Sequence, residues 1–253
     1  MKDKRLLIIG LDCAPPSLIF DRAEKLPHLR QLMANGIYGP LRSCDPPITI
    51  PAWMVMATGR DPGELGLYGF RHRKGYEYNK MWIANSTAVR EKTVWDYLGE
   101  QGKKSILVGV PPSYPPKPVR GELISCFITP SSEKPYTYPE ELKAEIEEHF
   151  GPFVFDVVFR TEDRSEVLKE IYQMTENHFQ VIDYLLDRQD WSLFWLVEIG
   201  VDRMHHAFWK FMDKSHHLYQ PGNPFESAIY DYYQFLDEKI GQLLKKIDER
   251  TAV

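Results

Sequence analysis

Short runs of apolar residues alternate along the chain with longer segments in which apolar residues recur every three or four positions. Residues 5–12 read RLLIIGLD, and residues 193–200 read LFWLVEIG. Runs this short, with few polar positions, are typical of strands that are buried on both faces of a parallel sheet. Residues 105–110 form a third such run, rich in β-branched side chains. We therefore predict three strands of a sheet that is covered by helices on both sides.

The segments between these runs have the periodicity and the end signals of helices. Residues 27–35 begin with Pro27 and are followed by Gly36, and residues 51–58 begin with Pro51 and are followed by Gly59. Proline is favoured in the first turn of a helix and glycine just after the last turn. Further helices are predicted at 93–101, 140–150, 166–188 and 225–250. This alternation predicts an α/β fold, a doubly wound, mostly parallel sheet flanked by helices, in a single domain that covers residues 1–253.

Two parts of the chain modify this picture. Prolines are frequent between residues 111 and 139, where all of them occur in the runs PPSYPPKP, ITPSSEKPY and TYP. Proline cannot donate a sheet hydrogen bond, so this segment is predicted to be a surface excursion outside the sheet. Residues 251–253 have the pattern of another strand, because a long helix in this architecture usually leads into one. The sheet is therefore expected to be incomplete at the C-terminus, with the chain forming the amino-terminal portion of a larger domain.

Composition narrows the class of function. Of the 253 residues, 26% are charged, and the net charge is −5 without a basic run, which gives no reason to expect nucleic acid binding. The three cysteines lack a C-x-x-C spacing and are interpreted as free thiols of a reducing compartment. The apolar run near the N-terminus is too short for a signal peptide or a membrane span. We expect a cytoplasmic protein that acts on a small molecule, with no membrane partner.

Two carboxylates follow predicted strands and are candidate metal ligands. Asp12 ends the first strand, and Asp202 comes just after the strand at 193–200. Ligands of open α/β sheets bind beyond the carboxyl ends of the strands, so the two side chains are expected to converge. If the next segment is helical, Asp202 and His206 share a face, and such a pair suits zinc or manganese. The alternatives are that Asp12 caps a helix and that Asp202 and His206 lie on a solvated helical turn.

Thr49 is a candidate nucleophile because it stands at the start of the helix that begins near Pro51. Backbone N–H groups at a helix start are unpaired and attract anions, so a phosphate could bind beside the threonine hydroxyl. The alternative is that Thr49 only caps this helix.

Three segments together resemble the alkaline phosphatase superfamily, in its type I phosphodiesterase/nucleotide pyrophosphatase branch. They are LLIIGLD, ITIPAWMVMATGRDPGELGLYGF and VEIGVDRMHH, in the order found in that branch and spread over nearly the whole chain. The resemblance implies a metal-dependent phosphoester hydrolase in which Thr49 is the covalent nucleophile. It also implies two divalent ions, zinc or alternatively manganese, with Asp12 and Thr49 on one and Asp202 and His206 on the other. His205 is a second choice as the histidine ligand.

The sequence departs from the family pattern in two ways. The family completes its site with an S-D-H-G motif and a later histidine, and this chain has no counterpart of either, so the second metal site is expected to be incomplete. The asparagine that binds phosphate in pyrophosphatases is also missing, with Phe70 near that position. Arg71, His72 and Arg73 are possible phosphate ligands in its place, or a solvated basic turn.

Three readings of function remain open at the level of sequence. The first is a phosphodiesterase or nucleotide pyrophosphatase. The second is a phosphomonoesterase or phosphomutase on the same scaffold. The third is a non-catalytic fragment with an incomplete metal site. The sulfatase branch is disfavoured, because the run Thr49-Ile50-Pro51-Ala52-Trp53 lacks the cysteine or serine and the arginine that sulfatases require.

Overall fold

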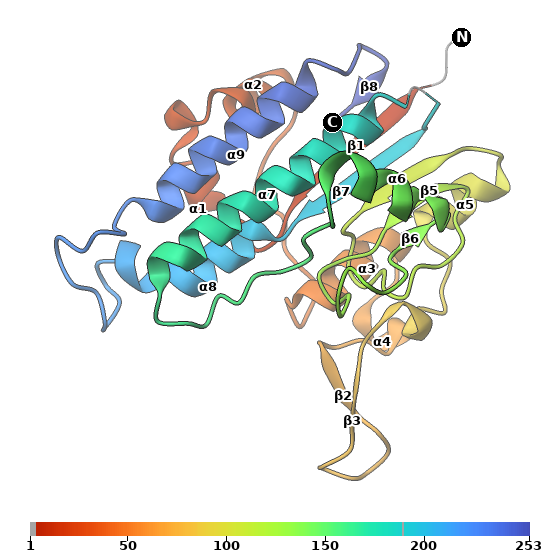
Figure 1. The fold of residues 1–253 in the computed structure, drawn as a ribbon, viewed down its shortest axis with the longest axis horizontal. Helices are drawn as coiled ribbons and strands as arrows, with labels where there is room; N and C mark the ends of the chain where they lie inside the picture. Colours follow the sequence, from red (N-terminus) through yellow and green to blue (C-terminus); the bar gives the residue numbers. More distant parts are fainter. Residues whose placement is uncertain (1–3, 189) are drawn as a thin grey trace.

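Strands and helices alternate along the chain around one central sheet. The computed structural model describes residues 4–188 and 190–253, and within these residues six strands form a sheet of order β6-β5-β4-β7-β1-β8 (Figure 1). All neighbouring pairs are parallel except β5 with β6, which is antiparallel. The strands are β1 (Arg5–Leu11), β4 (Ser105–Val108), β5 (Gly121–Ile124), β6 (Thr137–Tyr138), β7 (Leu193–Glu198) and β8 (Thr251–Ala252). The predicted mostly parallel α/β architecture is confirmed.

Helices cover both faces of this sheet and bury two hydrophobic cores. Successive strand residues point to opposite faces, so Phe194 and Leu196 join the first core whereas Trp195 and Val197 join the second. The first core is covered by α1 (Pro16–Ile19), α2 (Pro27–Asn35), α6 (Glu141–Phe150), α7 (Arg164–Leu186), α8 (Gly200–Met212) and α9 (Ala228–Leu244). The second is covered by α3 (Thr49–Thr58), α4 (Pro62–Leu65) and α5 (Val94–Glu100). Figure 1 shows α7, α8 and α9 alongside one another.

Several predicted boundaries are close to the observed ones. Helix α2 has the predicted limits, and α3 ends at Thr58 with Gly59 in the left-handed conformation that its position after the helix requires. The strand predicted at 251–253 is present as β8, in which Thr251 pairs with Arg5 of β1. The terminal helix is shorter than predicted, because α9 covers Ala228–Leu244 only.

The proline-rich segment 111–139 was predicted to lie outside the sheet, and this prediction is wrong. The segment supplies β5, which pairs with β4 on one side, and β6 at the sheet edge. The physical reason is that the prolines flank the strands and do not interrupt them. Pro118 precedes β5 and Pro139 follows β6, so the ladder N–H groups are intact.

A two-stranded hairpin stands apart from the central sheet. It consists of β2 (Arg71–Arg73) and β3 (Met81–Ile83), and it projects from the body of the molecule (Figure 1). Tyr76 and Tyr78 at its tip are almost fully exposed. Two short 3-10 helices complete the described elements, η1 (Ala23–Lys25) and η2 (Ser86–Ala88).

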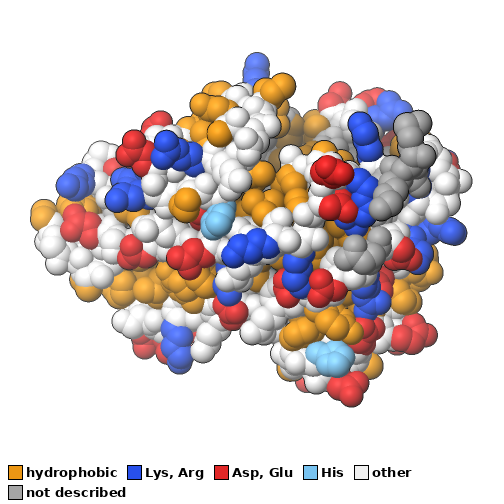
Figure 2. All heavy atoms as spheres, turned by 90° about the horizontal axis from the view of Figure 1, so that it is seen from above, with side chains coloured by type: hydrophobic (Ala, Val, Ile, Leu, Met, Phe, Trp, Pro, Cys, Tyr) orange, Lys and Arg blue, Asp and Glu red, His pale blue; other side chains and the backbone are white. Residues whose placement is uncertain are grey.

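The distribution of charged side chains and the state of the cysteines agree with what the composition predicts. On the face shown in Figure 2, acidic and basic side chains are interspersed among hydrophobic ones. No helix in residues 4–188 and 190–253 combines the length and the apolar character needed to cross a membrane. Cys13, Cys44 and Cys126 are free thiols, as predicted.

Candidate functional site

The parallel strands β1 and β7 end at the same edge of the sheet and bring two carboxylates together. Asp12 follows β1, and its backbone N–H donates to the carbonyl of Glu198, the last residue of β7, at 3.1 Å. Helix α8 begins at Gly200, two residues after the end of β7, and Asp202 therefore lies in its first turn. Asp12, Thr49, Asp202 and His206 all line one open cavity of about 730 Å³. The structure therefore brings together the four residues predicted for metal binding and nucleophilic attack.

Thr49 contacts Asp12 directly. Its hydroxyl Oγ1 donates to Oδ2 of Asp12 at 3.1 Å, across two segments that are far apart in the sequence. Thr49 is the first residue of α3, Ile48 is the N-cap, and no side chain caps this helix. The interpretation of Thr49 as a helix cap is thus wrong, because its hydroxyl is turned toward the carboxylate.

Asp12 is a buried carboxylate held by neutral donors. It is 4% exposed, and the indole Nε1 of Trp53 donates to its Oδ1 at 2.8 Å. Burial and the nearby charge of Asp202 raise the pKa of Asp12, while the hydrogen bonds from Trp53 and Thr49 oppose that rise. In the part of the chain that the structure describes, no cationic side chain forms an ion pair with Asp12. A buried carboxylate in this state favours the approach of a cation.

The position of Trp53 depends on a glycine in β1. A Cβ atom on Gly10 would lie 2.4 Å from Cη2 of Trp53, closer than such atoms can approach. Glycine at this position lets the indole lie against the strand, with its N–H directed at Asp12. Sequence patterns did not reveal this role of Trp53, since it depends on a contact between segments more than forty residues apart.

Asp202 and His206 lie one turn apart on α8, as the predicted helical spacing requires. Nε2 of His206 is 3.5 Å from Oδ1 of Asp202, and the half-exposed imidazole stacks on Phe159 with ring centres 5.3 Å apart. His205 points elsewhere. It is buried against Tyr233, whose hydroxyl is 3.2 Å from Nε2, and burial lowers the pKa of His205 to about 4. Of the two neighbouring histidines, His206, the predicted metal ligand, is the one that lines the cavity.

The basic residues predicted as phosphate ligands lie elsewhere. Arg71, His72 and Arg73 form strand β2 of the projecting hairpin, and they are absent from the described residues that line the cavity. His72 stacks on Trp82 at 4.6 Å, and Arg73 lies over the ring of Tyr78 at 4.8 Å. These contacts stabilise the hairpin.

Two other arginines line the cavity and were not singled out from the sequence. Arg203 follows Asp202 on α8 and bonds to it and to Asp156. Arg160 belongs to the loop before α7, and its guanidinium lies 5.3 Å from the ring of Phe159. An arginine that immediately follows a candidate ligand was a visible signal for Arg203, whereas the loop sequence around Arg160 has no distinguishing pattern.

A family model for type I phosphodiesterase / nucleotide pyrophosphatase matches residues 6–253. The chain belongs to this family. The family is a branch of the alkaline phosphatase superfamily, so the resemblance seen in the sequence is confirmed. No curated protein matches the chain.

Solved structures with a similar fold include phosphonoacetate hydrolase from Sinorhizobium meliloti 1021. One is a complex with phosphonoformate, at 17% identity and a TM-score of 0.55 over 97% of this chain. Another is a complex with phosphonoacetate, at 15% identity and a TM-score of 0.53 over 96% of this chain. The chain spans only about half of that hydrolase, 54% of its length in both comparisons. At these identities the likeness shows the fold.

The side chains that line this cavity offer the types of donor atom that divalent metal ions bind. Asp12 with Thr49 offers oxygen donors, and Asp202 with His206 offers an oxygen and a nitrogen. Asp12 is buried and accepts hydrogen bonds from the neutral side chains of Trp53 and Thr49, and a bound cation would compensate the charge of its carboxylate, which supports the fit. In number the set is sparse. No group of three or more His, Cys, Asp or Glu side chains suited to one metal ion occurs in residues 4–188 and 190–253.

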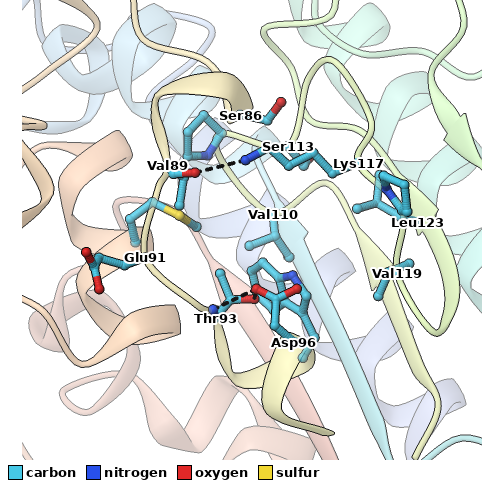
Figure 3. Close-up of a pocket in the computed structure, with 14 residues that line it drawn as sticks. Ser86, Val89, Glu91, Thr93, Asp96, Val110, Ser113, Lys117, Val119 and Leu123 are labelled. Atoms are coloured by element: carbon cyan, nitrogen blue, oxygen red, sulfur yellow. Dashed lines mark hydrogen bonds between the residues drawn. The ribbon is translucent and has the colours of Figure 1, made fainter. Parts of the chain in front are cut away.

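A second cavity, shown in Figure 3, lies between α5 and the proline-rich segment. Its polar groups are largely paired with each other, because Thr93 N–H donates to Asp96 at 2.8 Å and Lys117 donates to the carbonyl of Val89 at 2.9 Å. Its volume of about 90 Å³ is much smaller than the 730 Å³ of the cavity that holds Asp12, Thr49, Asp202 and His206. The larger cavity is therefore the candidate site.

Proposed function

We propose that this chain carries the nucleophile of a metal-dependent phosphoester hydrolase of the phosphodiesterase/nucleotide pyrophosphatase type. The observation that carries the proposal is the Thr49–Asp12 hydrogen bond of 3.1 Å, formed at the start of a ten-residue helix and beside an open cavity. The substrate is a small-molecule phosphoester. Zinc is the proposed metal, with manganese as the alternative, and the free thiols are compatible with a cytoplasmic protein.

Thr49 takes the nucleophilic step in this proposal. Its Oγ1 would lose its proton to solvent and attack phosphorus, and the new P–O bond would form as the bond to the leaving alkoxide breaks and that alkoxide takes a proton from water. A second water would later cleave the phosphothreonine to release phosphate or its monoester. The Asp12 carboxylate accepts the hydroxyl hydrogen and so orients an oxygen lone pair of Thr49 toward the cavity. In the first turn of α3, Pro51 has no N–H and Ala52 donates to the Ile48 carbonyl at 2.9 Å, so the N–H groups of Thr49 and Ile50 are the proposed donors to a phosphate oxygen.

Asp12 with Thr49 would hold one divalent ion and Asp202 with His206 the other. When bound, the ions lower the pKa of the hydroxyl and of water and neutralise charge on the phosphoryl oxygens. Arg160 is the proposed contact for a substrate anion because it lines the cavity, unlike Arg71, His72 and Arg73, the possible phosphate ligands in the sequence.

The test is hydrolysis of bis-p-nitrophenyl phosphate and p-nitrophenyl phosphate with added zinc or manganese. We expect Thr49→Ala to lower kcat by about three orders of magnitude or more, because the nucleophile is lost. Thr49→Ser keeps a hydroxyl and is expected to retain part of the activity. The matched control is Thr58→Ala at the opposite end of α3, where the hydroxyl donates to the Met54 carbonyl and accepts from the backbone N–H of Arg60.

Each outcome bears on the proposal. Hydrolysis that survives Thr49→Ala, or that needs no metal, would contradict the mechanism. A preference for the diester supports the phosphodiesterase proposal, and a preference for the monoester supports the phosphomonoesterase or phosphomutase alternative. A wild-type chain that binds phosphate but hydrolyses neither ester would favour the non-catalytic alternative.

A further inference from the structure

The guanidinium of Arg203 joins two carboxylates at the base of the cavity. Its Nε and Nη2 donate to the two oxygens of Asp156 at 2.5 and 2.8 Å, and its Nη1 donates to Oδ2 of Asp202. Asp156 belongs to the loop between α6 and α7, whereas the other two residues belong to α8. The contact with Asp156 uses both donors on one edge of the guanidinium, which is the geometry that fixes an arginine most firmly.

The surroundings of Arg203 restrict it further. Its side chain is 9% exposed, and its planar group lies over the rings of Phe127 at 5.1 Å and Phe159 at 4.8 Å. Aromatic rings at its faces and carboxylates at its edges leave the arginine little freedom to turn.

This arrangement divides the two oxygens of Asp202 between two tasks. Oδ2 is bound by Arg203, and Oδ1 is directed to the side of His206, 3.5 Å from its Nε2. Rotation of the carboxylate would break the contact with Arg203, so the oxygen next to His206 is held in place. We propose that Arg203 and Asp156 are positioning residues that hold Asp202 for cation binding. The inference rests on the proposed role of Asp202 as a metal ligand.

The negative charge of Asp156 also offsets the positive charge of Arg203. Two carboxylates and one guanidinium give this group a net charge of −1, so it still attracts a cation although Arg203 lies beside the ligand. Without the charge of Asp156, the group would be neutral, and Arg203 would be free to turn its remaining donors toward Asp202. Charge and orientation therefore predict the same direction of change when Asp156 is replaced.

The experiment measures Mn²⁺ and Zn²⁺ affinity of the purified chain by isothermal titration calorimetry. We expect Asp156→Asn and Arg203→Lys each to weaken binding about 10- to 100-fold, the usual effect of losing a residue that orients a metal ligand. Arg203→Lys keeps the charge but loses the two-pronged contact, so a loss in this variant reports orientation and not charge.

The chain offers a matched control at a distance from the cavity. Arg188 also joins two carboxylates, Glu122 at 2.6 Å and Glu145, and it also lies over an aromatic ring, that of Tyr184. We expect Arg188→Lys and Glu145→Gln to alter thermal stability but to leave metal affinity unchanged.

Two results would overturn the inference. The first is a lower unfolding temperature for Asp156→Asn with unchanged metal affinity of the folded protein, which would mean that the group only ties a loop to α8. The second is equal metal affinity in the wild type and Asp202→Ala, which would remove Asp202 from the ligands. If the wild type binds metal but hydrolyses no ester, and Arg203→Lys weakens that binding, the proposed function fails while this inference stands.

Discussion

The close contact between Gly10 and Trp53 connects the absence of a side chain at residue 10 with the hydrogen bonding of Asp12 in the cavity. The indole lies against β1 only because residue 10 has no Cβ, and the same indole donates to Asp12. A glycine within a buried strand therefore helps to fix a carboxylate two positions later.

Gly10→Ala tests this link. The added Cβ would displace the Trp53 ring, so we expect the free energy of unfolding to fall by about 1–3 kcal/mol and esterase activity to fall with it. Chemical denaturation and the p-nitrophenyl assays measure the two effects. Gly39→Ala is the control, because a Cβ there meets no atom within 4 Å. Unchanged stability in Gly10→Ala would show that the indole can move at little cost.

A buried ion pair between α7 and the last residue of β7 makes the stability of the protein depend on pH. Nδ1 of His178 lies 2.9 Å from Oε2 of Glu198, and Nε2 of the same ring contacts the Val154 carbonyl. Burial disfavours the charged imidazole, but the Glu198 carboxylate and the two hydrogen bonds outweigh it and raise the pKa of His178.

The sign of the effect on stability follows from that direction. A raised pKa means that the folded protein binds the proton more tightly, so the stabilisation is complete below about pH 6.5 and disappears as pH rises through the folded pKa. We expect His178→Gln to cost about 3 kcal/mol at pH 5.5 and less at pH 8.5, as measured by urea unfolding. A difference from wild type that does not change with pH would contradict this. His217→Gln, on an exposed loop, serves as the control.

At the scale of elements, α2 is held by a residue of another helix. Its N-cap Leu26 supplies no side-chain acceptor, and the carboxylate of Asp237 in α9 accepts from the backbone N–H groups of His28 at 3.0 Å and Leu29 at 2.8 Å. Asp237 is 1% exposed. A carboxylate from the neighbouring helix thus does the work of a local cap and fixes α2 against α9.

Asp237→Ala leaves both N–H groups without their acceptor. We expect a loss of about 2–4 kcal/mol in the free energy of unfolding, measured by thermal or urea denaturation. Glu238→Ala changes the next, exposed residue and is expected to stay within about 0.5 kcal/mol of the wild type. Equal effects of the two substitutions would rule out the capping role.

These elements also show where sequence patterns succeed. Pro27 and Gly36 mark α2 correctly, because end signals act through the local backbone. The spacing of Asp202 and His206 was sufficient to place both on one face of α8. The proline-rich segment was misread, because the position of each proline relative to a strand depends on how β5 pairs with β4.

Sequence patterns predicted only part of the candidate site, because they do not encode contacts between distant segments. Strand ends identified Asp12 and Asp202, since the carboxyl ends of parallel strands share an edge. The bond from Trp53 to Asp12 and the contacts of Arg203 with Asp156 join segments far apart in sequence, and no local pattern encodes them. The possible phosphate ligands in the sequence, Arg71, His72 and Arg73, belong to the hairpin, whereas Arg160 and Arg203 line the cavity.

At the scale of the whole molecule, the two cores share one sheet. Trp191 belongs to the first core, and Trp195 to the second, although only a few residues separate them. Because every central strand contributes to both cores, neither layer of helices can lose its packing without exposing the other.

We therefore expect the chain to unfold as one unit, as predicted for a single domain. Circular dichroism, tryptophan fluorescence and calorimetry should give one coincident transition, with equal calorimetric and van't Hoff enthalpies. Two separate transitions, or enthalpies that disagree, would contradict the single domain.

The pairing of β1 with β7 has a consequence for biosynthesis. Strand β1 leaves the ribosome well before its central neighbour β7, because paired residues such as Leu6 and Leu193 lie 187 residues apart in the sequence. Until β7 is translated, the apolar edge of β1 has no parallel partner and is open to aggregation or to capture by chaperones. Asp12 and Asp202 can meet only after that delay, so the cavity cannot form before α8 has been translated.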